Sequence, residues 1–177
     1  MNWRSGVFGT TAFVVTLLAV PCRAGEVGDY LTEDGKLKQA VTVTTGMAGL
    51  VPVGGPKTEV WTIEPSGDWT RKLTGAKGRL SAKQLAALAQ HLATQDFNSL
   101  PRSQGCEDRG PDDGYLYLKI AFGKKEVQFN TRQGESRADY LPKPGDPKAA
   151  AWSRFVALEL VLADMLDMSE RKEKKEK

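Results

Sequence analysis

The sequence predicts an α+β fold, in which a mainly antiparallel sheet of four or five strands carries two helices on one face. Two pairs of short alternating segments are joined by turn residues, which is typical of β-hairpins. Two longer segments carry apolar side chains at helical spacing. Only the stretch between residues 74 and 115 places a helix between neighbouring strands, so few parallel connections are expected. The predicted order of elements is β-β-β-α-β-β-α, arranged as a two-layer sandwich.

The first three strands are expected in the N-terminal half of the chain. Residues 39–45 alternate between apolar and polar side chains, as a half-buried strand does. Residues 57–64 and 69–74 are expected to form a hairpin, because residues 65–68 (PSGD) are turn formers. Proline presets φ in such a turn, and glycine accepts a positive φ. Residues 75–78 are predicted to be a basic, flexible link.

The strongest local signal predicts a helix over residues 82–95. Ser81 followed by Gln84 is a capping-box pattern, in which the two side chains bond the free N–H groups at a helix start. Leu80 is placed to pack against Leu85 as a hydrophobic staple. The apolar stripe of this helix consists of Leu85, Leu88 and Leu92.

A second hairpin and a last helix are expected in the C-terminal half. Residues 115–122 and 126–131 form the hairpin, and the helix runs from near Pro147, a residue favoured in a first helical turn, to near Ser169. The predicted inward face of the first strand consists of Leu116, Leu118, Ile120 and Phe122, and its outward face of Tyr115, Tyr117 and Lys119. Polar loops are expected on either side of the hairpin, at residues 102–114 and 132–148.

Residues 1–24 are predicted to be a signal peptide. Arg4 precedes an apolar stretch from Val7 to Val20, about 14 residues long, whereas a bilayer span needs roughly 20. Ala24 is small and suits the position before the cut, so cleavage is expected between Ala24 and Gly25. The protein is therefore expected to be exported to the periplasm or beyond the cell. An uncleaved anchor or a buried helix is the alternative.

A single domain is expected over residues 39–168, after a polar lead-in at 25–38 and before a charged tail at 169–177. The net charge is +3 for the whole chain and +1 without the leader, and the excess lies in the tail, which mixes both signs. A nucleic-acid binder carries a basic stripe on its fold, so no nucleic-acid partner is expected. Without its leader the chain is expected to have no membrane span and to be a monomer.

Few residues are available for catalysis or metal binding. The chain has one histidine, His91, and two cysteines, Cys22 and Cys106. Cys22 follows a proline rather than the small residue that precedes a lipid-attachment cysteine, and it is lost with the leader, so no disulfide within the chain is expected. The sequence has no G-x-S-x-G elbow, EF-hand spacing or phosphate-loop pattern. It therefore predicts a non-enzymatic protein with no cofactor and no bound metal.

One loop has the composition of a contact surface. Residues 46–55 hold apolar side chains among glycines and a proline, and apolar residues on an exposed loop are candidates for partner contacts. The alternative is that this loop folds under the edge of the sheet and buries those side chains. The candidate partner-binding residues are Met47, Leu50, Val51 and Val53.

Four short motifs together resemble the emfourin family of protealysin inhibitors and related secreted bacterial domains. They are TTGMAG at residues 44–49, WTIEPSG at 61–67, GRLS at 78–81 and QDFNSLP at 95–101. The resemblance covers about residues 39–131 and implies the same fold. The chain departs from that family in its leader, in its long loops at 102–114 and 132–148, and in its last helix.

The resemblance also implies a protein partner, because emfourin-type domains bind and inhibit thermolysin-like metallopeptidases. The loop at residues 46–55 would then meet the peptidase cleft, with Leu50 and Val51 as its apolar side chains. The alternative is an interaction protein of the cell envelope that uses the same loop or the lysine-rich tail.

Overall fold

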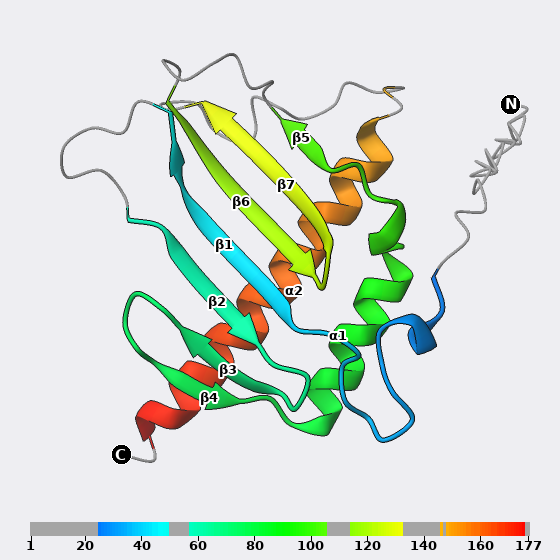
Figure 1. Cartoon of the computed structure of the whole chain (residues 1–177), viewed down its shortest axis with the longest axis vertical. Coiled ribbons are helices and arrows are strands. Elements are labelled where there is room, and N and C mark those ends of the chain that lie inside the picture. Colours follow the sequence, from blue (N-terminus) through cyan, green and yellow to red (C-terminus); the bar gives the residue numbers. More distant parts are fainter. Residues whose placement is uncertain (1–24, 50–56, 106–113, 133–145, 147, 176–177) are drawn as a thin grey trace, which may run out of the picture.

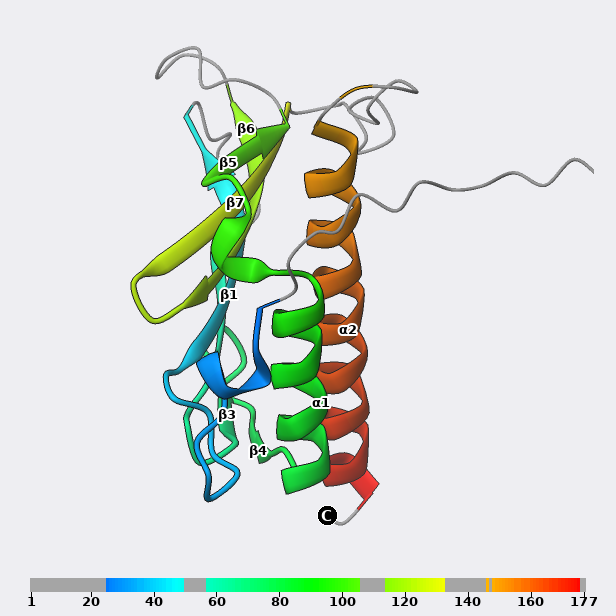
Figure 2. The same cartoon turned by 90° about the vertical axis from the view of Figure 1, so that its right-hand side faces the viewer.

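The computed structural model describes residues 25–49, 57–105, 114–132, 146 and 148–175 (Figure 1). They form two layers, a twisted sheet and a layer of two helices packed on one of its faces (Figure 2). The helices are α1 (Ala82–Thr94) and α2 (Lys148–Lys175), and the short 3-10 helices are η1 (Val27–Asp29) and η2 (Phe97–Ser99). The strands are β1 (Val41–Ala48), β2 (Glu59–Ile63), β3 (Asp68–Arg71), β4 (Lys77–Arg79), β5 (Ser103–Gly105), β6 (Tyr115–Phe122) and β7 (Lys125–Arg132).

The predicted α+β class is confirmed, whereas the predicted number of strands is wrong. The described residues form one sheet of seven strands in the order β4-β3-β2-β1-β6-β7-β5. All neighbouring strands are antiparallel except β5 and β7, which are parallel. No helix in the described part of the chain is long and apolar enough to span a membrane.

The two additional strands are edge strands in segments whose sequence predicts a link and a loop. β4 pairs with β3 and places Gly78 opposite Trp69. β5 pairs with β7 and ends at Gly105, whose φ of +86° is reserved largely for glycine. Each strand has only three residues and little alternation of its own. Pairing with a longer neighbour makes them strands, and a local pattern does not reveal such pairing.

The core lies between the sheet and the two helices. Its central strands contribute the alternating residues that the sequence predicted, and α1 contributes its leucine stripe. The capping box at the start of α1 is present, because the Ser81 N–H donates to Gln84 Oε1 at 2.9 Å and the Gln84 N–H donates to Ser81 Oγ at 3.4 Å. The largest core side chains that are fully buried include Trp69, Tyr30, Phe97, Phe155 and Leu158.

Residues 25–38 belong to this core, although their sequence predicts a lead-in outside the domain. Tyr30 is 0% exposed and Leu37 is 1% exposed, and the Tyr30 ring lies 5.2 Å from the Phe122 ring. The chain turns back between Tyr30 and Leu37, so both side chains enter the core from one short segment. Because most residues of this segment are polar, its sequence does not indicate that Tyr30 and Leu37 are buried.

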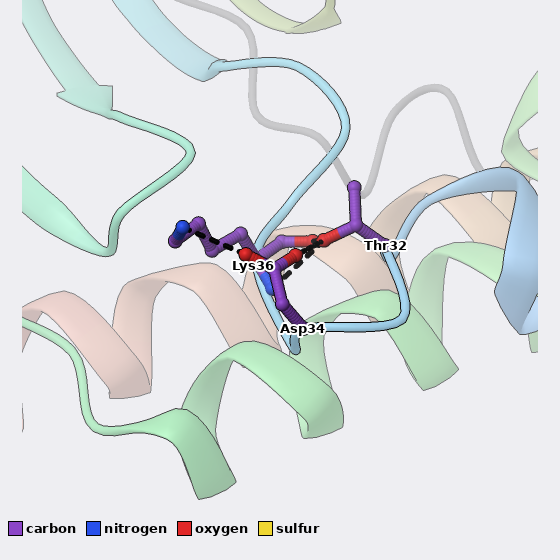
Figure 3. A network of polar contacts seen from close by, with 3 residues as sticks. All are labelled: Thr32, Asp34 and Lys36. Atoms are coloured by element: carbon purple, nitrogen blue, oxygen red, sulfur yellow. Dashed lines mark hydrogen bonds and ion pairs between the residues drawn. The ribbon is translucent and has the colours of Figure 1, made fainter.

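A small polar network holds this turn closed (Figure 3). Thr32 Oγ1 donates to the Lys36 carbonyl at 2.9 Å, and Asp34 bonds both the Thr32 hydroxyl, at 2.5 Å, and the Lys36 ammonium, at 2.7 Å. These hydrogen bonds, led by the one from Lys36, lower the pKa of Asp34 below its ordinary value. The network joins three exposed side chains and accounts for a tight turn in a polar stretch.

The last helix is longer than predicted. It begins at Lys148, as expected, but continues past Ser169 to Lys175. The added turns are rich in glutamate, lysine and arginine, which have high helix propensity. The apolar stripe of α2 ends earlier, and its last buried side chain among the described ones is Leu166.

Candidate interaction surface at one end of the sheet

Of the four predicted contact residues, the structure describes only Met47. Met47 lies in β1 on the side that faces the helices, and it is only 8% exposed. Leu50, Val51 and Val53 lie outside the described residues. Met47 is therefore part of the packed sheet rather than of a loop tip, and the role of the other three stays a prediction.

The strand directions bring three chain connections to the same end of the sheet (Figure 1). β1 ends there and β2 begins there, because the two strands are antiparallel. β6 begins beside the end of β1, and β5 and β7 both end there. The β1–β2, β5–β6 and β7–α2 connections therefore all leave the sheet at one end. Long connections grouped at one end of a rigid scaffold are a common arrangement for binding.

The strand ends at this position carry large side chains. We call the residues Gly46, Met47 and Ala48 of β1 and Tyr115, Leu116 and Tyr117 of β6 the β1–β6 end; the register pairs Gly46 with Tyr117, Met47 with Leu116 and Ala48 with Tyr115. Because side chains alternate along a strand, both tyrosines point away from the helices and Leu116 points toward the helix side. Leu116 is nevertheless 37% exposed. The two tyrosine rings lie 6.5 Å apart and are tilted by 59°.

Gly46 allows the Tyr117 side chain to lie against the sheet. A Cβ atom at Gly46 would lie 2.7 Å from Tyr117 Oη and 3.0 Å from Thr58 Oγ1. The tyrosine therefore crosses β1 and reaches toward the start of β2. A glycine in a strand commonly marks such a close approach.

A polar cluster supports the same region from the neighbouring strands. Asn130 of β7 pairs with Tyr117 in register and is only 4% exposed. Its side-chain oxygen accepts a hydrogen bond from Gln128 Nε2 at 2.6 Å, and its amide nitrogen donates to Ser103 Oγ at 3.5 Å. The Asn130 amide thus ties β5 to β7 where both strands approach this end.

The sequence predicts that the two tyrosines point outward but gives them no role. Their signal is two tyrosines at i and i+2 on the polar face of a strand, which is compatible with an ordinary solvent-exposed sheet. What distinguishes them is their position beside the β1–β2 connection. That position depends on strand pairing and register, which the local pattern does not reveal.

The other candidate chemistries find no support in the described part of the chain. His91 lies in the last turn of α1. Among the described residues, no group of three or more histidine, cysteine, aspartate or glutamate side chains is placed to hold a metal ion. Cys106 and residues 107–113 of the acidic loop lie outside that part.

Comparison with protein-family models and with curated proteins finds no match for this chain. The resemblance to the emfourin family therefore rests on the four short motifs alone.

Proposed function

We propose that this protein is an exported, non-enzymatic binding module that holds another protein at the β1–β6 end. The observation that supports this proposal is that β1, β5 and β7 end, and β2 and β6 begin, at the end of the sheet that holds Tyr115, Leu116 and Tyr117. Tyrosines are typical of the buried centres of protein interfaces, where a few side chains carry most of the binding energy, and Leu116 adds apolar area beside them. The central strands β1 and β6 supply a rigid support for that surface.

We further propose a thermolysin-like metallopeptidase as the partner. The emfourin-like motifs favour this class, and one of them, at residues 44–49, includes the end of β1. The segment that follows it carries Leu50 and Val51, which suit a cleft that prefers large apolar side chains. The β1–β6 end would support this segment from the side of the sheet.

The direct test is a titration of residues 25–177 against a thermolysin-like metallopeptidase, with residual cleavage of a small peptide as the readout. We expect stoichiometric loss of cleavage while the domain itself stays intact. The double variant Leu50→Asp/Val51→Asp should raise the inhibition constant by at least about 30-fold, the effect of losing one strong interface contact. An unchanged inhibition constant would refute the role of this segment.

Two further variants test the β1–β6 end itself. Leu116→Asp and Tyr117→Ala should each weaken inhibition, because both residues adjoin the β1–β2 connection. The matched control is Leu160→Asp, which makes the same change at a 64% exposed leucine on α2, and it should leave inhibition unchanged. Equal effects of Leu116→Asp and Leu160→Asp would contradict the assignment of the surface.

The alternative partner is a protein of the cell envelope. It would be favoured if no peptidase of this class were inhibited while the domain still captured a protein from the envelope fraction. Loss of that capture on deletion of residues 170–177 would assign it to the charged tail, and loss in Leu116→Asp would assign it to the β1–β6 end.

A further inference from the structure

The backbone nitrogen of Gly25 lies at the C-terminal end of α1. It donates a hydrogen bond of 3.0 Å to the carbonyl oxygen of Ala93, which also accepts from the Asp96 N–H at 2.9 Å. Ala93 belongs to the last turn of α1, where carbonyl groups lack helical partners. The helix dipole places a partial negative charge at this end, which favours a cation there.

A buried oxygen without a hydrogen bond lies beside Gly25. The Tyr30 side chain is 0% exposed, and a Cβ atom at Gly25 would lie 3.6 Å from Tyr30 Oη and 3.7 Å from Ala93 Cα. Tyr30 Oη forms no hydrogen bond of normal geometry, although the nearby Asn98 backbone N–H acts to lower the pKa of this hydroxyl. An unpaired buried hydroxyl is costly, so a donor at this place would be favourable.

The surroundings of this oxygen are negatively charged. Burial is the main cause that raises the pKa of Tyr30, and the negative charges of Asp96 and Asp29 raise it further. The Asp96 carboxylate also forms an ion pair with Arg154, whose guanidinium nitrogen lies 3.7 Å away. Asp29 accepts a hydrogen bond of 3.3 Å from the Glu26 N–H. The Gly25 nitrogen thus lies at a helix C-terminus, in a residue next to a buried hydroxyl on which two carboxylates act.

We infer that the mature protein begins at Gly25 and that its α-ammonium group binds at the C-terminal end of α1. An amide at this position has one N–H and no charge, whereas an ammonium has three N–H donors and a full positive charge. It can keep the hydrogen bond to the Ala93 carbonyl and adds two N–H donors in the residue that lies next to Tyr30 Oη. Removal of a leader after Ala24 creates this group, and a cut at any other bond does not.

The site makes the stability of the mature protein depend on the charge of its α-amine. An ordinary α-amine has a pKa of about 8, and the negative surroundings should raise it in the folded state. The stabilisation is then complete below about pH 8 and is lost as the pH rises through the raised value. The other titratable or charged groups on the segments that meet here are Glu26 and Asp29 of η1 and its cap, His91 in the last turn of α1, Asp96 after that helix, and Arg154, which pairs with Asp96.

The first experiment locates the cut. The full chain is expressed in a Gram-negative host, and the N-terminus of the exported protein is read by sequencing and intact mass. We expect a chain that begins Gly25-Glu26-Val27. An exported chain that begins at any other residue would overturn the inference.

The second experiment measures the ammonium site. Purified chains 25–177 and 24–177 differ by one residue that moves the charge away from Ala93. At pH 6.5 we expect the chain beginning at Gly25 to have a Tm about 1–4 °C higher, and this difference should vanish near pH 10. Equal Tm values at pH 6.5 would overturn the inference.

Matched variants test whether the Tm difference comes from the charge of the α-ammonium group or from the one-residue difference in chain length. Asp29→Asn and Asp96→Asn should each reduce the Tm difference between the two chains, and asparagine keeps an oxygen that accepts hydrogen bonds. Gly25→Ala should keep the difference, because its Cβ finds ordinary contact distances. A Tm difference that persists at pH 10, or that neither aspartate variant changes, would refute an electrostatic origin.

Discussion

The contact between Trp69 and Gly78 gives the sharpest test of the sheet register. Trp69 is fully buried, and a Cβ atom at Gly78 would lie 2.5 Å from two carbons of its ring and 2.7 Å from Nε1. Substitution Gly78→Ala therefore makes a methyl group overlap with the Trp69 ring, and the buried ring cannot move out into solvent to avoid it. The overlap involves three atoms of a rigid ring rather than the end of a flexible side chain.

The expected cost follows from two opposing effects. Overpacking of a filled core costs about 1–3 kcal/mol, whereas replacing glycine by alanine restores about 0.4–1 kcal/mol by restricting the unfolded chain. The midpoints of these ranges leave a net destabilisation of about 1.3 kcal/mol, which lowers the Tm of a chain of this length by about 3–5 °C. Thermal unfolding of the purified domain, followed by circular dichroism, measures this shift.

A matched glycine gives the opposite sign. A Cβ atom at Gly28 would have no neighbouring heavy atom within 4 Å, so Gly28→Ala should leave the Tm unchanged or raise it. Combining Gly78→Ala with Trp69→Phe should destabilise the protein by less than the sum of the two single changes, because the shared overlap is relieved. A Tm of Gly78→Ala at or above that of the original protein would refute the pairing of β3 with β4.

The remaining predictions concern two carboxylates. Hydrogen bonds from Lys36 and Thr32 lower the pKa of Asp34, so its support of the turn is present above its ordinary pKa and is lost as the pH falls through the lowered value. A smaller protection factor of the Lys36 amide at low pH, after division by the intrinsic exchange rate at each pH, measures this loss, as does faster exchange in Asp34→Asn at neutral pH. The pKa of Glu59 is likewise lowered, chiefly by its hydrogen bonds with Arg71, and the side chains of Arg71 and Glu59 are 24% and 16% exposed. Glu59→Gln should cost about 1–3 kcal/mol at pH 7, and urea unfolding should show that cost shrinking as the pH falls below about 4; a cost independent of pH would contradict this.

The parts of the fold that the sequence predicts well are those with local signals. The start of α1 depends on Ser81, Gln84 and the leucines around them, all within one or two helical turns. The hairpin of β6 and β7 depends on strict alternation and on a glycine turn. In both cases the residues that determine the element are neighbours in the chain, so their spacing alone is enough to predict it.

The missed parts depend on contacts between distant residues. β4 is a strand because Gly78 leaves room for the Trp69 ring, and nothing in the letters Lys-Gly-Arg indicates that ring. Tyr30 and Leu37 enter the core because a polar turn reverses the chain between them. In each case a short or polar segment gains its structure from a partner elsewhere.

The exposure of the β1–β6 end also depends on contacts that the local sequence pattern does not reveal. Alternation correctly puts Leu116 on the same side of β6 as Leu118, but it does not say how far the helices reach along that side. Leu118 is 6% exposed and Leu116 is 37% exposed, whereas Met47, which pairs with Leu116 on the same side of the sheet, is 8% exposed, so the cover is lost over the start of β6 but not over the end of β1. Beyond that point the β1–β6 end offers Leu116 on one face of the sheet and two tyrosines on the other. A partner meeting this end can therefore contact both faces of the sheet at once.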